Sequence, residues 1–145
     1  MRRTNVFAPS FDHSSERDGY SWRAARVGRA IGSKLMGATL YELPDGEKSY
    51  PFHFHHVMEE WLLVVAGSPV LRGADGDRVL RAGDVVCFPT GPEGAHQVLG
   101  PGMVLFISAS HSPEAIEYLD SGKVGVRPPG KIFRLADATD YWEGE

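Results

Sequence analysis

Short apolar segments separated by turn-forming residues recur along most of this chain. Segments such as "TLYEL", "VVCF" and "MVLFISA" have the length of strands, and turns such as "LPDG", "GADGD" and "GPG" join them. The 17 glycines and 10 prolines are scattered along the chain rather than clustered. Strands of about 4 to 8 residues at intervals of about 8 to 12 residues are typical of β-sandwiches and β-barrels. The sequence therefore predicts an all-β protein.

The same pattern predicts how the chain is organised. With 145 residues and neither a linker nor an internal repeat, we expect one domain, residues 1–145. The strand-like segments run from about residue 35 to about residue 109. Residues 1–33 are polar and mixed, which predicts an N-terminal arm that packs over the domain or exchanges with a partner subunit. In the C-terminal part, residues 112–145, "SPEAIEYL" predicts one short helix followed by a tail, because serine suits the N-cap and proline the first turn.

Charge and apolar content argue against several kinds of partner. The net charge is -4 and no basic stretch recurs, so we expect neither nucleic acid nor an anionic membrane as a partner. The longest apolar run, residues 61–66, is too short to cross a bilayer, and the N-terminus lacks the apolar segment of a signal peptide. We therefore expect a cytoplasmic protein. The single cysteine, Cys87, excludes an intrachain disulfide and is expected to fill space in the core.

Five ionisable residues precede an apolar run in "HFHHVMEEWLLVVAG", residues 53–67. Such side chains are costly to bury unless they are paired or bind a metal. In an extended strand, residues two apart point to the same face, so His53 and His55 project together and can chelate one ion. Taken alone, the pair leaves open a second interpretation, two exposed histidines at the end of a strand.

Glu60 favours the metal interpretation. On "EWLLVVA", alternation places Glu60 on the same face as Leu62 and Val64. A carboxylate there faces an apolar interior unless a positive charge meets it. If "HVME" links two strands, Glu60 returns towards His53 and His55, and a bound divalent cation would offset its loss of hydration.

Among the other ionisable residues, one is a further candidate metal ligand, and several are not expected to bind the metal. His96 begins the later strand "HQVL" after a glycine-rich turn, and its alternative interpretation is an ordinary histidine at a strand edge. Glu59 and His56 are expected to point away from the site into solvent. His13 and His111 lie in polar, irregular surroundings and are not expected to be ligands.

These residues resemble the two motifs of the cupin family. "G-x6-HFH-x4-E-x6-G", from Gly46 to Gly67, is similar to the first motif, and "G-x5-P-x-G-x4-H", from Gly83 to His96, to the second. Both have extra residues in turns, where insertions are tolerated. The resemblance spans about residues 35–109 and implies a double-stranded β-helix, the cupin jelly-roll barrel. The inward-pointing metal ligands that it implies are His53, His55, Glu60 and His96.

The ligand set constrains the function only in part. Three histidines and one glutamate suit one divalent ion per chain, Zn, Fe, Mn, Ni or Cu. The resemblance implies a fold and a site but no reaction. With such a metal site, the first hypothesis is a metalloenzyme acting on a small oxygen-rich metabolite, as an oxygenase, a lyase or decarboxylase, or a sugar isomerase, with the metal as Lewis acid. A metal-dependent domain that binds or senses a small ligand and a purely structural site are the alternatives. The side chains expected to line the barrel as helpers are Tyr41, Phe52, Trp61, Leu105 and Arg72.

The outward-facing residues of the apolar run predict an association between chains. Trp61, Leu63 and Val65, together with "MVLFI", offer more apolar surface than one small barrel interior needs. We therefore expect a homodimer. The alternative is that these residues lie under the N-terminal arm and the helix of the same chain.

Overall fold

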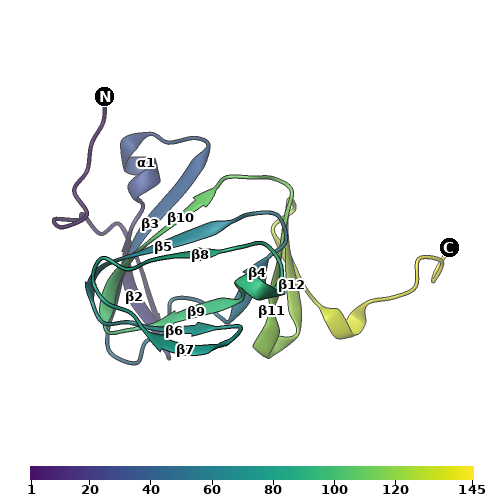
Figure 1. The fold of residues 1–145 in the computed structure, drawn as a ribbon. Helices are drawn as coiled ribbons and strands as arrows, with labels where there is room; N and C mark the ends of the chain where they lie inside the picture. Colours follow the sequence, from purple (N-terminus) through teal and green to yellow (C-terminus); the bar gives the residue numbers. More distant parts are fainter.

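Thirteen β-strands form two antiparallel sheets that enclose an apolar interior (Figure 1). The structure, a computed structural model, describes residues 1–145. The first sheet contains, in spatial order, β1 (His13–Arg17), β2 (Tyr20–Ala25), β3 (Met36–Leu43), β10 (Gly102–Ala109), β5 (Glu60–Gly67) and β8 (Val85–Phe88). The second contains β13 (Lys131–Arg134), β12 (Lys123–Arg127), β11 (Glu114–Tyr118), β4 (His53–His55), β9 (His96–Leu99), β6 (Val70–Gly73) and β7 (Gly76–Val79). The helical elements are α1 (Val27–Ile31) and the 3-10 turns η1 (Pro92–Gly94), η2 (Leu119–Ser121) and η3 (Leu135–Asp137). The all-β fold that the sequence predicts is confirmed.

The core lies between the two sheets and follows the predicted alternation. On β5, Leu62 and Val64 are fully buried, whereas Trp61, directly before Leu62, is about half exposed. Leu62 and Val64 share one buried cluster with Tyr41 of β3 and Val98 of β9. Glu60, two residues before Leu62, therefore starts on the face of β5 that looks into the interior.

The outer face of the first sheet is covered by the N-terminal part of the same chain. β2 pairs with β3, so part of the predicted arm is built into the sheet. Val6, Phe11 and Val27 pack on the outer face around Leu40. The covered outward-facing side chains include Leu63, Val65, Met103 and Ile107. For Leu63 and Val65 this is part of the alternative that the sequence left open, whereas Trp61 stays about half exposed. The homodimer stays a prediction.

The segment "SPEAIEYL" is a strand, so the predicted C-terminal helix is wrong. It forms β11, which pairs with β4 on one side and with β12 on the other. The local signals for a helix start, Ser112 and Pro113, are outweighed by hydrogen bonds to two neighbouring strands, because tertiary context overrides weak propensities. The one α-helix, α1, has five residues, and no helix has the length and hydropathy of a membrane span.

Cys87 lies on the surface, so the prediction that it fills the core is also wrong. Its strand, β8, is the edge of the first sheet and alternates between its two faces. Phe88 is buried, whereas Cys87 and Val85 are exposed on the opposite face, beside the exposed Trp61 of β5. Since side chains alternate along a strand, an apolar run of four residues does not require both faces to be buried.

Candidate metal centre

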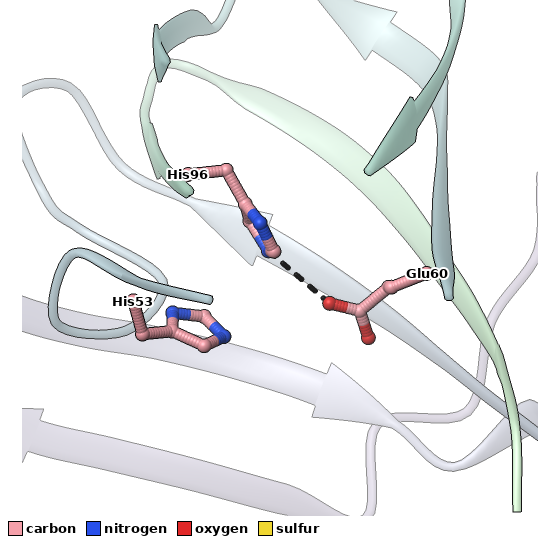
Figure 2. A group of neighbouring side chains, drawn as sticks. All are labelled: His53, Glu60 and His96. Atoms are coloured by element: carbon pink, nitrogen blue, oxygen red, sulfur yellow. Dashed lines mark hydrogen bonds and ion pairs between the residues drawn. The ribbon is translucent and has the colours of Figure 1, made fainter. Parts of the chain in front are cut away.

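Three ionisable side chains from three strands point towards one another (Figure 2). His53 begins β4, Glu60 begins β5 and His96 begins β9. β4 and β9 are neighbours, and His53 is directly opposite His96. One donor atom from each of the three residues lies within 4.8 Å of the other two. The structure therefore brings three of the four predicted ligands into one group.

Hydrogen bonds to the backbone orient both histidine rings of this group. His53 Nδ1 lies 2.8 Å from the carbonyl oxygen of Pro51, and His96 Nδ1 lies 2.8 Å from that of Gly94. A carbonyl oxygen only accepts, so each Nδ1 must carry a proton and donate it. In the neutral rings the Nε2 atoms are then bare and directed into the group. This is how protein surroundings usually prepare a histidine to bind a metal.

The contact between His96 and Glu60 fits a shared cation. His96 Nε2 lies 3.2 Å from Glu60 Oε2, the dashed contact in Figure 2. Because His96 donates its Nδ1 proton to Gly94, the Nε2 atom of the neutral ring carries a lone pair and no proton. This lone pair faces the Glu60 carboxylate oxygen, and the contact is unfavourable without a positive charge between the two atoms. Nitrogen and oxygen ligands bind zinc at about 2.0 to 2.2 Å, so two ligands of one ion are about 3 Å apart. The donor set and its spacing suit a divalent metal.

His55 lies beside this group at longer distance. Its Nε2 is 3.8 Å from Glu60 Oε2, and its Nδ1 is 3.9 Å from Glu114 Oε1. His55 Nδ1 is also the one buried side-chain nitrogen or oxygen in the structure without a hydrogen-bond partner. Such orphaned atoms are rare, since they lose their hydration without replacement. His55 is thus buried with one nitrogen facing the group and the other facing a second carboxylate.

Glu114 is a buried residue of the site region that the sequence analysis missed. Its carboxylate accepts hydrogen bonds from the backbone N–H groups of His56, Val57 and Met58, at 3.1, 3.3 and 2.8 Å. These three residues belong to the loop between β4 and β5, so Glu114 holds the loop that connects the histidines to Glu60. The available signal was an acidic residue at the start of an alternating segment, which the helix prediction concealed.

The residues expected to point away do so. His56 is exposed and its Nε2 lies 2.8 Å from Glu117 Oε1. Glu59 is exposed and accepts a hydrogen bond from Trp61 Nε1 at 2.9 Å. The two charged neighbours of the ligand strands are therefore part of the surface, as the alternation predicts.

An aromatic wall borders the group. The Phe88 ring stacks on His96, with centroids 3.7 Å apart. The hydroxyls of Tyr41 and Tyr50 contact each other, and the Tyr50 ring is 6.3 Å from that of His53. Burial, with the Tyr50 charge second, raises the pKa of Tyr41, and burial also raises that of Tyr50. Both phenols therefore stay protonated at neutral pH and can donate hydrogen bonds.

Of the five predicted helpers, only Tyr41 lies in the interior beside the group. Leu105 belongs to the outer apolar cluster and Trp61 is exposed. Arg72 forms an ion pair with Asp120 through both terminal nitrogens and stacks on Phe52, which lies in a small cluster apart from the main core. The face that each of these side chains occupies depends on the register between neighbouring strands, and this register cannot be read from the sequence alone.

Burial favours the neutral form of His53 and of His55. Loss of hydration, reinforced by the neighbouring His96, lowers the pKa of His53 to about 4. Loss of hydration also lowers the pKa of His55, against the opposing effect of Glu60 and Glu114. A neutral imidazole is the form that binds a metal, so the folded chain holds both rings ready at neutral pH.

We expect the metal-free protein to lose stability as the pH falls from about 6.5 to about 4. In this window the unfolded chain binds a proton at residue 53 that the folded chain does not bind. The unfolded state then binds more protons, so the free energy of unfolding falls with pH, by about 3 kcal/mol at pH 4 for His53 alone. Urea unfolding of the chelator-treated protein between pH 7.5 and pH 4 measures this change in the free energy of unfolding. His53→Gln lacks the titrating group, and a pH dependence as steep as that of the unmodified protein would contradict the assignment.

Part of the chain is similar to a known protein family. A family model described as "Cupin domain" matches residues 39–108. No curated protein matches the chain. The matched residues include the four predicted ligands, His53, His55, Glu60 and His96. The resemblance to the cupin family that the motifs indicate is confirmed.

Solved structures extend the likeness over almost the whole chain. A sugar phosphate isomerase of the cupin superfamily from Silicibacter pomeroyi is 22% identical, with 95% of this chain and 96% of that chain covered and a TM-score of 0.81. A candidate sugar phosphate isomerase from Acidithiobacillus ferrooxidans is 24% identical, with 90% and 86% covered and a TM-score of 0.78. The polyketide cyclase RemF from Streptomyces resistomycificus is 18% identical, with 79% and 83% covered and a TM-score of 0.62. At these identities the likeness establishes the jelly-roll fold.

Proposed function

The chain carries a cupin domain over residues 39–108, and we propose that it is a divalent-metal-dependent isomerase of small phosphorylated sugars. The observation that carries the proposal is the convergence of His53, Glu60 and His96, whose donor atoms lie within 4.8 Å of one another beside an aromatic wall. The two solved structures with the higher TM-scores bear the name sugar phosphate isomerase, which favours this reaction among those that the ligand set allows.

His53, Glu60 and His96 would hold the ion, with His55 as a fourth ligand. The His55 ring needs a small movement towards Glu60, since its Nε2 is 3.8 Å from the carboxylate oxygen. When bound, a divalent ion at this place would supply Lewis acidity, polarising a carbonyl oxygen of the substrate. The unpartnered His55 Nδ1 faces Glu114, which can orient the ring as carboxylates orient ligand histidines elsewhere.

The remaining side chains bind and shield the substrate. Aldose–ketose isomerisation moves hydrogen between two neighbouring carbons and leaves the overall oxidation state unchanged. The protonated hydroxyls of Tyr41 and Tyr50 can donate hydrogen bonds to the hydroxyl and carbonyl oxygens of such a substrate. Phe88 and Phe106 lie against His96 and exclude water from that side. Tyr50 is 40% exposed, so we propose that a substrate enters past this side chain.

We expect metal-dependent interconversion of aldose and ketose phosphates. The protein is stripped with chelator, reloaded separately with Mn, Fe(II), Zn, Ni or Cu, and assayed against pentose and hexose phosphates by NMR. Turnover should disappear on stripping and return with at least one metal, and Glu60→Gln should lose it while Glu59→Gln keeps it. Binding of metal and sugar phosphate without any turnover would instead identify a metal-dependent binding domain.

A further inference from the structure

The face of the second sheet that carries His53 continues beyond the barrel wall. His53 is directly opposite Tyr118 of β11, Tyr118 is opposite Lys123 of β12, and Lys123 is opposite Arg134 of β13. Directly paired residues of antiparallel strands have their side chains on the same side of a sheet. Lys123 and Arg134 therefore lie on the same side of the sheet as His53. Figure 1 shows this part of the sheet, β11 and β12, next to β4.

Arg127 lies on the same side. It is directly opposite Glu114, two residues along β12 from Gly125, and Gly125 is two residues from Lys123. Lys123 and Arg127, four residues apart on β12, therefore share the side of the sheet that carries His53.

Between the two cations the sheet surface is formed by Gly125 and Tyr118. A Cβ atom at Gly125 would lie 3.3 Å from the Tyr118 ring, so that ring extends over the glycine. The Tyr118 ring is also 6.1 Å from the ring of His53. An aromatic side chain thus bridges the distance from the metal group to the cationic strand.

The hairpin β12–β13 is cationic and not neutralised by the protein. Residues 123–134 contain two lysines and two arginines and no acidic residue. None of the four forms an ion pair, whereas Arg23, Arg26, Arg72 and Arg78 each pair with a carboxylate. The acidic tail that follows the hairpin extends away from the barrel (Figure 1). In a chain of net charge -4, this hairpin is therefore a local concentration of positive charge, which attracts anions.

We propose that Lys123 and Arg127 bind the phosphate group of the substrate, with Arg134 at the outer end of the row. This inference rests on the proposed isomerase function and names the phosphate end of its substrate. Lys123 stands two strands from His53, about 10 Å at the usual strand spacing. A pentose or hexose phosphate can span that distance, with its carbonyl end at the metal group and its phosphate at the cations. Arginine and lysine are the side chains that bind phosphate most strongly in proteins.

Isothermal titration calorimetry with inorganic phosphate, glucose 6-phosphate and glucose tests the site. The double variant Lys123→Gln/Arg127→Gln should bind both phosphate compounds at least about tenfold more weakly, because two charge-assisted contacts are removed. Lys131→Gln is the matched control, since Lys131 belongs to the same hairpin but is opposite Val126, on the other side of the sheet. It should keep the affinity of the unmodified protein, and glucose should bind more weakly than glucose 6-phosphate throughout.

Three results would overturn the phosphate site. The first is unchanged phosphate affinity in the double variant. The second is an equal loss of affinity in Lys131→Gln, because the effect would then reflect only the overall charge of the hairpin. Binding of inorganic phosphate without binding of glucose 6-phosphate would also contradict it, since the site would then serve free phosphate. The metal content of the double variant should stay unchanged. Failure of turnover with phosphate binding intact would contradict the isomerase function alone, so the two proposals can fail separately.

Discussion

Replacing His53 or His96 with alanine is expected to leave the purified protein without stoichiometric metal. Each residue supplies an Nε2 atom that a backbone carbonyl has already oriented, so no other rotamer or tautomer has to be selected on binding. Loss of an outer-shell partner alone costs about 10- to 100-fold in metal affinity, and we expect loss of a direct ligand to exceed about 100-fold. Elemental analysis after dialysis against metal-free buffer measures the content per chain.

Two variants control this experiment. His56→Ala removes a neighbouring histidine that is exposed and paired with Glu117, and it should keep full metal content. His96→Gln retains volume against Phe88, so its folded state can be checked independently of metal content. If both alanine variants retain one metal per chain, the ligand assignment is wrong. His55→Ala should lose less metal than either, because His55 lies further from the group.

Replacing Glu114 with alanine should destabilise the protein by about 3 to 5 kcal/mol. The carboxylate is 3% exposed and accepts hydrogen bonds from three backbone N–H groups. Removing it leaves the N–H groups of Val57 and Met58 without their acceptor, Met58 in a buried place, whereas the His56 N–H keeps its hydrogen bond to the carbonyl oxygen of Ala115. Each unsatisfied buried group costs about 1 to 3 kcal/mol. The loop between β4 and β5 should loosen, so metal affinity should fall as well. Urea unfolding and a metal titration measure the two effects.

Glu117→Ala is the matched control for this prediction. Glu117 is on the same strand and contacts His56 at the partly exposed surface, so its removal should cost no more than about 1 kcal/mol. Glu114→Gln keeps the shape of the side chain but loses the charge and one acceptor, and should fall between Glu114→Ala and the unmodified protein. A Glu114→Ala variant as stable as Glu117→Ala would show that the loop does not depend on this carboxylate.

Much of the fold is predictable from the sequence because it depends on local periodicity. The alternation on "EWLLVVA" correctly predicts Leu62 and Val64 in the core and Trp61 outside. "HQVL" and "MVLFISA" likewise become β9 and β10 with nearly the predicted bounds. Each of these inferences needs only the period of two residues along an extended strand.

The errors fall where local signals and distant contacts disagree. Ser112 and Pro113 have the local chemistry of a helix start, yet the following residues pair with β4 and β12 and form a strand. With the segment taken as a helix, Glu114 could not be recognised as the residue that holds the β4–β5 loop. The apolar run "VVCF" predicts Cys87 in the core, but β8 lies at a sheet edge with one open face, and Cys87 is exposed.

The sequence by itself determined the all-β fold, the inward face of β5 and the kinds of donor that the site contains. Those properties follow from residue type and from the alternation of side chains along one strand. Only the tertiary structure decided that His96 stands opposite His53, that Glu114 reaches the loop, and that Lys123 lies two strands from His53. Each of these depends on the register between strands distant in sequence, and a shift of one residue would turn every side chain to the other face.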